Sequence, residues 1–556
     1  MYLARKYHRQ LSQLICSDDP RAFLLAAGLL LGCLAAIGLL VVKLGSPPMN
    51  GCPWDSPFLV DGAWRIRNGQ VPHRDFYNFT GDLPFYTTLL GMRLGGPCLS
   101  AIDYGNAVLM AVPSLAALWV LRRRTSALLA FLFSLFTALL VVTPRPLGSP
   151  YDFTDHAMLY NRFGEAFILV LAALVFLPPR QAFDNRRSDW AEGALTGFLL
   201  VALLGCKVNY FIVGVLFFGA AIFLRRISPV RAFACVAGGG AILATALLLT
   251  GIPLSSLCGD FRIVGACQSP AEKMRVFAIQ GMKSLPLLPL LLLFAWEAAQ
   301  GERLQKGRPR LWVHPFVVTT IFAGGVLLLS SNAQAGEICL LASAALYIAE
   351  IIRRQTPPPD ASPMFGLARN VSALLLVLFF LLPTLVTDLK TMRHVTFATI
   401  QHHWVVARTL ESTPLRDFRL APDGSRQEEI AEYRAELDEG MQLLRDQLQP
   451  DMRLNALLFA NPFHIALGLS PANGGMLCVA GNGMSRGSHP SLDRVVGNAT
   501  HILVRRADPN PHDAYGAEWD SMNLELVAET KRFALYKVPQ GLADRLKKVA
   551  PEGASR

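Results

Sequence analysis

One stretch of the chain, residues 54–86, concentrates acidic side chains between apolar segments. Its four aspartates are Asp55, Asp61, Asp75 and Asp82. Asp55 follows the first apolar segment closely, so we expect its carboxyl near a membrane surface and partly removed from water. Loss of water raises the pKa of a carboxyl and makes it suitable as a general base. For Asp55, catalysis and helix capping stay open as alternatives, whereas capping fits Asp61 and Asp82 better than catalysis does.

A second group of polar residues lies between residues 151 and 162. It contains Asp152, Asp155 and His156, whose side chains are suitable ligands for a divalent cation. One imidazole and two carboxylates within five residues form a weak pattern, and anchoring of a short loop is the simpler explanation. A nucleotide-binding P-loop is absent. We therefore expect no cofactor and keep a metal at these three residues as an alternative.

The elements that must position these residues are membrane helices. Apolar segments of roughly the length that crosses a bilayer recur along the chain. The eleven predicted helices lie near residues 22–42, 101–121, 126–143, 165–179, 191–206, 208–224, 232–250, 284–299, 313–330, 336–352 and 370–388.

Composition supports a membrane protein and excludes other classes. Of the 556 residues, 52% are hydrophobic and 17% charged, which is too apolar for a disordered chain. The formal net charge is +11, and residues 1–388 carry all of this excess. Alternate connections between the predicted helices contain 20 of the 32 Lys and Arg residues of that part. By the positive-inside rule the N-terminus is cytoplasmic and the C-terminus is outside, and a nucleic-acid binder is not indicated.

The chain thus divides into two predicted domains. Residues 1–388 form the transmembrane part, and its first outside loop spans residues 43–100. Within that loop, residues 58–67 and 84–94 have the spacing of interfacial helices. Residues 389–556 carry short apolar runs between Gly, Asn and Pro, which predict a small α/β domain outside the membrane. The fold class is therefore mainly α, a polytopic helical membrane protein with this domain appended.

The ten cysteines do not indicate a metal or redox site. No Cys-X-X-Cys motif and no Cys/His ligand spacing occurs. Cysteines inside apolar segments are expected to be small buried side chains. Cys258 and Cys267 lie nine residues apart in an outside loop, and a disulfide between them is an open question.

The acidic stretch resembles the first periplasmic loop of bacterial GT-C glycosyltransferases, which include lipid A aminoarabinose transferases and protein O-mannosyltransferases. That loop has an acid after the first helix, here Asp55. It then has a Gly-X-X-Pro-(Tyr/His)-Arg-Asp-Phe segment, here Gly69–Phe76. It closes with Gly, Pro and aromatic residues, here Gly81–Tyr86. One difference is that many relatives have two adjacent acids where this chain has Asp55-Ser56.

The resemblance implies transfer of a sugar, with inversion, from a polyprenyl-phosphate donor to an envelope acceptor outside the bacterial inner membrane. The acceptor would be a lipid, a glycan or a protein, and membrane lipids are further partners. In this interpretation Asp55 is the base, and Asp75 orients the acceptor or positions Arg74.

Such a transfer also needs cations for the leaving phosphate. The resemblance places a lysine at Lys207, where snorkelling to the membrane surface is the equally good alternative. The sequence Tyr160-Asn161-Arg162 resembles a subgroup of the family. The implied substrate- and phosphate-binding residues are His73, Arg74, Tyr160, Asn161, Arg162 and Lys207.

Two other classes of function stay open. A transporter or flippase of a lipid-linked substrate would place its polar residues within helices, whereas here they gather in outside loops. A non-catalytic envelope assembly protein would have no need of Asp55, Arg74 and Lys207 together.

Overall fold

The computed structural model describes residues 20–180, 186–267, 269–306, 311–331, 337–355, 363–422, 426–477, 479, 487–507, 511–539 and 541–542. This part of the chain is mainly helical, with one small sheet near the C-terminus. The predicted fold class, a helical membrane protein with a small C-terminal α/β region, is confirmed. The N-terminal segment that we expect to be cytoplasmic, residues 1–19, lies outside the described residues.

Every predicted membrane segment coincides with helix. The helices are α2 (Pro20–Leu44), α5 (Ala101–Leu109) with α6 (Ala111–Leu121), α7 (Ala127–Val142), α8 (Leu159–Phe176), α9 (Arg186–Cys206), α10 (Val208–Phe223), α11 (Pro229–Thr250), α14 (Leu287–Lys306), α15 (Val313–Ser331), α16 (Leu341–Arg354) and α17 (Pro363–Ile400). Within the described residues, seven spans are long and apolar enough to cross a membrane. An eighth results if α13 (Pro270–Ser284) and α14, bent by 65°, form one span. The helices α7 and α10 are apolar but shorter.

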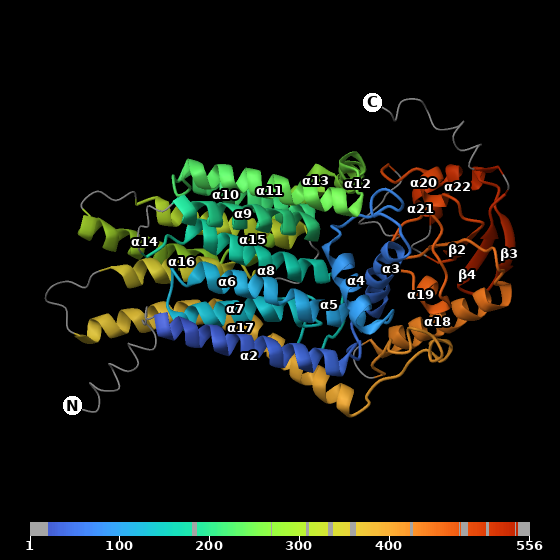
Figure 1. Cartoon of the computed structure of the whole chain (residues 1–556), viewed down its shortest axis with the longest axis horizontal. Helices are drawn as coiled ribbons and strands as arrows, with labels where there is room; N and C mark the ends of the chain where they lie inside the picture. Colours follow the sequence, from blue (N-terminus) through green and yellow to red (C-terminus); the bar gives the residue numbers. More distant parts are fainter. Residues whose placement is uncertain are drawn as a thin grey trace.

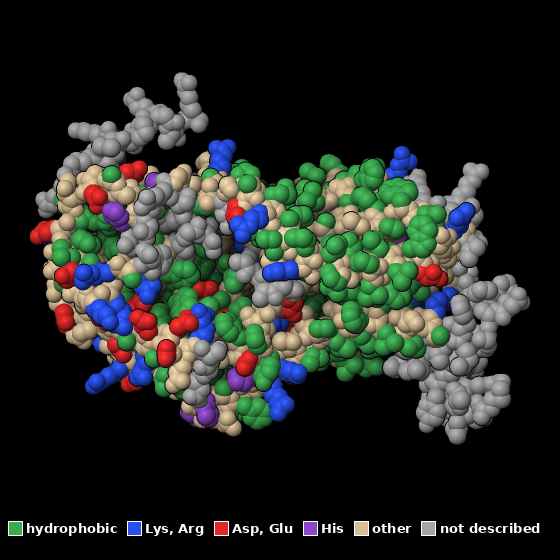
Figure 2. Space-filling view, turned by 180° about the vertical axis from the view of Figure 1, so that it is seen from behind, with side chains coloured by type: hydrophobic (Ala, Val, Ile, Leu, Met, Phe, Trp, Pro, Cys, Tyr) green, Lys and Arg blue, Asp and Glu red, His purple; other side chains and the backbone are tan. Residues whose placement is uncertain are grey.

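The apolar helices lie side by side along the long axis of the molecule, with the C-terminal elements at one end (Figure 1). Helix α8 is buried along almost all of its length, whereas α2 and α11 expose most of their leucine-rich surface. A helix that is apolar on all sides suits such a buried place in the bundle. Figure 2 shows the corresponding surface: hydrophobic side chains cover the bundle, and charged side chains gather over the C-terminal region.

Several helix boundaries differ from the predicted ones by five residues or more, and two of them bear on the site. Helix α8 begins at Leu159, six residues before the predicted start, because Tyr160, Asn161 and Arg162 are already helical. Helix α17 continues past the predicted domain boundary at residue 388 to Ile400. Its last turns carry Lys390 and Arg393, so the apolar pattern ends before the helix does.

The outside loops contain further helices, which lie between the bundle and the C-terminal elements (Figure 1). These are η1 (Pro53–Asp55), α3 (Ser56–Arg67), α4 (Leu83–Gly95) and α12 (Leu254–Ala266). Pro57 and Pro84 stand in the first turns of α3 and α4, where a missing N–H has no cost. Both predicted interfacial helices are thus present. However, the indole N–H of Trp64 donates to the carbonyl of Leu469, 2.8 Å away, in the C-terminal region.

The C-terminal region combines one long helix with a four-stranded sheet. Its elements are η2 (Arg408–Leu410), α18 (Gln427–Gln447), β1 (Leu454–Leu457), α19 (Phe463–Leu467), α20 (Leu492–Val496), β2 (His501–Arg505), α21 (Pro511–Tyr515), α22 (Ala517–Ser521), β3 (Glu525–Glu529) and β4 (Phe533–Lys537). The strand order is β1-β2-β4-β3, with β1 and β2 parallel and the other pairs antiparallel. A register shift lies between Leu526 and Ala528 of β3.

The possible disulfide is not formed. Cys258 and Cys267 are both free cysteines. They stand at the middle and the end of the same helix, α12, where nine residues correspond to about 13 Å along the axis. A disulfide needs Cα atoms about 4.4–6.8 Å apart, so helix formation itself separates the two thiols.

Candidate functional site

The loop before α3 is held against the loop between α7 and α8, and this contact places Asp55 beside Asp155. The backbone N–H of Cys52 donates to Asp155 Oδ2 at 2.7 Å, and the N–H of Ala157 donates to Asp155 Oδ1 at 2.8 Å. Asn50 and Thr154 add further hydrogen bonds between the two loops. A Cβ on Gly51 would approach Asp155 Oδ2 to 2.0 Å, so only glycine permits this close approach.

Asp55 differs from the other acids of the site because its carboxyl makes no hydrogen bond or ion pair with the described residues. It stands at the end of η1, where it immediately precedes α3, and it stays partly exposed. Burial and the nearby carboxylate of Asp155 raise the pKa of Asp55 to about 8. Burial likewise raises the pKa of Asp155 to about 6, although its two backbone hydrogen bonds oppose this shift. A carboxyl that titrates near pH 8 can accept a proton from a substrate hydroxyl.

Helix α18 of the C-terminal region covers this carboxyl pair. The ring of Tyr433 packs edge-on against Trp54, with 5.9 Å between the ring centroids. The guanidinium of Arg426 also lies over the ring of Trp54, 5.1 Å from its centroid. Arg426 also donates to the carbonyl of Gly51 at 3.1 Å and to Cys52 Sγ at 3.2 Å. The sequence analysis did not find Arg426 or Tyr433, because more than 370 positions separate them from the loop that they touch.

Both ring nitrogens of His156 have hydrogen-bond partners in the protein. Its Nδ1 lies 3.1 Å from Ser56 Oγ, and its Nε2 lies 3.1 Å from Asp103 Oδ1. These three side chains are buried, and Ser56 also donates to Met49 Sδ, so the serine is not presented as a nucleophile. Asp155 faces backbone N–H groups and Asp152 is exposed. Across the described residues no group of three His, Cys, Asp or Glu side chains has the arrangement of a metal site.

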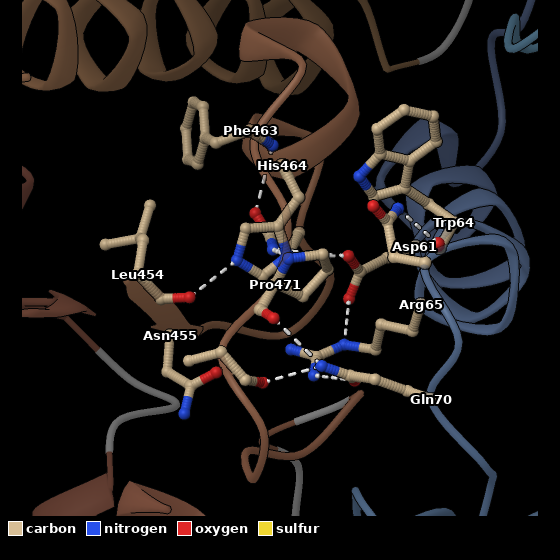
Figure 3. Close-up of polar contacts among 12 residues, drawn as sticks. Asp61, Trp64, Arg65, Gln70, Leu454, Asn455, Phe463, His464 and Pro471 are labelled. Carbon is tan, nitrogen blue, oxygen red and sulfur yellow. Dashed lines mark hydrogen bonds and ion pairs between the residues drawn. The ribbon is translucent and has the colours of Figure 1, made fainter. Parts of the chain in front are cut away.

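Asp61 connects α3 to the C-terminal region and does not cap a helix (Figure 3). It lies within α3, and Arg65 donates to its Oδ2 at 3.1 Å. His464 Nδ1 lies 2.9 Å from Asp61 Oδ1, and His464 Nε2 lies 3.0 Å from the carbonyl of Leu454. Burial opposes ionisation, but Arg65 and His464 together hold the pKa of Asp61 below its ordinary value. The helix-start prediction for Asp61 is thus wrong, because the helix begins five residues earlier.

His73 is enclosed by two carboxylates. Its Nδ1 lies 2.8 Å from Asp260 Oδ2 and its Nε2 lies 3.3 Å from Asp82 Oδ1. Although burial opposes the charged form, these carboxylates raise the pKa of His73 to about 9. Asp260 of α12 also pairs with Arg494, which in turn donates to the carbonyl of His73. His73 therefore holds the first loop, α12 and the C-terminal region together, and both nitrogens of its imidazole lie against carboxylates.

Asp75 and Arg74 form a local pair at the surface. Arg74 donates to both carboxylate oxygens of Asp75 at 2.8 Å, and the backbone N–H of Val71 donates to Asp75 Oδ2 at 2.7 Å. Partial burial opposes ionisation, but these hydrogen bonds lower the pKa of Asp75. The structure does not join this pair to Asp55 by any contact between the residues it describes.

The predicted cation Arg162 is part of an internal ion pair. Its Nη2 lies 2.7 Å from Asp388 Oδ2 in α17, and it donates to the carbonyls of Leu139, Leu140 and Arg145. Arg145 binds the same aspartate at 3.0 Å. The side chain of Arg162 is thus committed to the packing of α7, α8 and α17.

The other residues of the predicted phosphate site gather where α8 and α10 begin. The ammonium of Lys207 lies 5.2 Å from the ring centroid of Tyr160. Asn161 is buried, and neither atom of its amide has a hydrogen-bond partner among the residues that the structure describes. Buried amides are nearly always hydrogen-bonded, so Asn161 has capacity to bind a ligand. Three of the predicted residues, Tyr160, Asn161 and Lys207, are therefore brought to one end of the bundle.

Comparison with known proteins gives a likeness in fold only. No protein-family model matches the chain, and no curated protein matches it. Two crystal structures of ArnT from Cupriavidus metallidurans are similar to it, one bound to undecaprenyl phosphate and one in the apo state. The alignments cover 93% of this chain and 98% and 99% of the two ArnT chains, with TM-scores of 0.42 and 0.43. Sequence identities are 11% and 13%, so this likeness does not assign a function.

Proposed function

We propose that this protein is an integral membrane glycosyltransferase that uses Asp55 as its catalytic base. It would move a sugar from a polyprenyl-phosphate donor to an envelope lipid, glycan or protein. The observation that carries the proposal is the state of Asp55: a partly exposed carboxyl without a cation, whose pKa burial and Asp155 raise to about 8. Perturbed carboxyls of this kind concentrate at catalytic sites.

The proposed reaction is a single displacement with inversion. The acceptor hydroxyl attacks the anomeric carbon while the bond between that carbon and the phosphate oxygen breaks. Asp55 takes the proton of the hydroxyl, and polyprenyl phosphate leaves with the electron pair of the broken bond. Asp55 thus accounts for the proton and polyprenyl phosphate for the electron pair, so the step needs no further reactant. A required metal ion is not part of the proposal.

The donor phosphate would lie against Lys207, with Tyr160 and Asn161 beside it. The ammonium supplies the positive charge that stabilises the leaving phosphate, and the unpartnered amide of Asn161 supplies a donor. Both residues stand at the ends of membrane helices, where the headgroup of a lipid-linked donor would reach them. In this proposal Asp75 positions Arg74 at the surface and does not touch the acceptor.

The apolar helices support a multi-pass location in the inner membrane. We propose that the N-terminus is cytoplasmic and that the C-terminal region is periplasmic, since the connections rich in Lys and Arg lie on the side away from Asp55. Helix α18, which covers Asp55, would then face the compartment that contains the acceptor.

The test compares the purified wild type with Asp55→Asn in detergent. Radiolabelled polyprenyl-phosphate sugars serve as donors, and an extract of envelope lipids serves as the acceptor. We expect label in the extract with the wild type and a loss of about 10²- to 10⁴-fold with Asp55→Asn, the usual contribution of a general base. Asp446→Asn, at an exposed acid of α18, is the matched control and should retain full transfer.

The outcomes distinguish the role of Asp55 as the base from the transferase activity itself. Equal transfer by the wild type and Asp55→Asn would exclude Asp55 as the base. Movement of a lipid-linked sugar across vesicle membranes without a new glycosidic bond would replace the transferase by a transporter. Asp55→Asn should not lower the thermal stability, because the uncharged form of this carboxyl is the one that burial favours.

A further inference from the structure

A cavity of about 820 Å³ lies at the other end of α3 from Asp55. It is bordered by the last turn of α3, by one face of α4 and by the end of α11. Helix α3 spans 12 residues, which corresponds to about 18 Å along its axis, so the cavity is separate from the carboxyl pair. The residues that border it include Arg67, Arg93, Tyr86, Leu89, Leu90 and Leu249.

The cavity carries positive charge without a counterion. Arg67 and Arg93 are both exposed, and none of the residues bordering the cavity is acidic. Arg67 lies over the ring of Trp64, 5.9 Å from its centroid, and the part of the chain that the structure describes gives neither arginine an ion pair. By contrast, Arg74 on the adjoining segment is neutralised by Asp75. Two guanidinium groups at one opening match a phosphate in charge and in hydrogen-bonding capacity.

The walls of the same cavity are apolar and continue into the membrane surface. Leu249 stands in the last turn of the candidate span α11, where it and Leu248 are each 83% exposed. Leu90 and Leu94 of α4 are also exposed, at 39% and 62%. In a bilayer, exposed leucines at the end of a spanning helix would face acyl chains, and the arginines beyond that end would meet the headgroups. The cavity therefore joins an apolar wall to a cationic opening, which matches the acyl chains and the phosphate of a phospholipid.

We propose that this cavity binds an anionic phospholipid of the surrounding bilayer, with its phosphate between Arg67 and Arg93 and its acyl chains along α4 and α11. A zwitterionic phospholipid carries its own cation beside the phosphate and so gains less from two unneutralised arginines. The bound lipid would fix the distance of α3 and α4 from the membrane surface. This inference does not depend on the glycosyltransferase proposal, because its ligand and its test do not involve transfer.

The test is photo-crosslinking of the purified full-length protein with lipids whose acyl chains carry a diazirine. Phosphatidylglycerol and phosphatidylcholine of the same acyl composition are compared, and the labelled peptides are mapped. We expect phosphatidylglycerol to label residues 89–94 and 248–250 preferentially. In the double variant Arg67→Gln/Arg93→Gln this labelling should fall by about tenfold or more, since both cations that attract the anionic headgroup are removed.

The matched control is Arg122→Gln, at an arginine that follows the last residue of α6, does not border the cavity and also lies over a tryptophan, Trp119. It should leave the labelling of residues 89–94 and 248–250 unchanged. Both arginines of the double variant are exposed, so it should elute from a sizing column like the wild type. Equal labelling by phosphatidylcholine, or full labelling of the double variant, would show that only the general lipid shell contacts this surface and would overturn the proposal.

Discussion

Two aspartates, the buried Asp388 and the partly exposed Asp55, have opposite surroundings. Asp388 of α17 lies between Arg162 and Arg145, at 2.7 and 3.0 Å. Asp55 lies near a second carboxyl, Asp155, and makes no ion pair with the residues that the structure describes. A buried charge with two partners is satisfied by the fold, whereas a carboxyl next to another carboxyl is held in an unfavourable state. The comparison indicates that Asp388 stabilises the protein and that Asp55 is available for chemistry.

The same contrast separates the predicted cations. Arg162 belongs with Asp388, because all of its described hydrogen bonds end on that carboxylate or on backbone carbonyls. Lys207 donates to the carbonyl of Ser331 at 3.5 Å, and its ammonium lies 5.2 Å from the ring centroid of Tyr160, so its contacts shown here include no carboxylate. Arg162 is thus held by a carboxylate and by backbone carbonyls, whereas in the proposed function Lys207 is the cation that meets the donor phosphate.

The largest expected effect on stability comes from removing Asp388, the aspartate that is paired with two arginines. Asp388→Ala leaves Arg145 and Arg162 buried without their shared counterion, although Glu337 still contacts Arg145 at 3.2 Å. Loss of one partner of a buried ion pair costs about 3–5 kcal/mol. We expect a clearly lower melting temperature in detergent, measured by intrinsic fluorescence. Asp446→Ala, at an exposed acid, should change it little, and an equally small change for Asp388→Ala would refute the structural role.

A smaller effect is expected where α3 meets the C-terminal region. His464→Ala removes one partner of the buried carboxylate Asp61 but leaves Arg65 in place. An unmet buried hydrogen bond costs about 1–3 kcal/mol, so we expect a lower melting temperature and faster proteolysis between α17 and α18. His512→Ala, at an exposed histidine of the same region, is the control. Unchanged proteolysis in His464→Ala would show that this network does not hold the two parts together.

The sequence could predict the features that depend on neighbouring residues. Hydropathy located each of the seven candidate spans that the described residues contain, and the position of Asp55 after the first of them singled out that carboxyl. The sequence could not predict which residues distant along the chain become partners. The pairs Arg162–Asp388 and His73–Asp260 join positions 226 and 187 residues apart, and neither pattern nor charge alone reveals them. Arg426 was missed for the same reason, since nothing in a charged helix indicates the loop that it covers.

The smallest expected effect tests the carboxyl pair itself through its pH dependence. As a base, Asp55 must lose its proton, so transfer by the wild type should rise with pH around a midpoint near 8. Asp155→Asn removes the negative charge that helps to raise the pKa of Asp55, while burial, the larger cause, persists. The midpoint should therefore move to lower pH by roughly one unit and stay above the ordinary value of a carboxyl. Transfer rates measured from pH 5.5 to 9.5 give both midpoints, with Asp446→Asn as the variant whose midpoint should match the wild type. An unchanged midpoint, or one moved to higher pH, would show that Asp155 does not act on the base through its charge and would leave burial as the sole cause of the raised pKa.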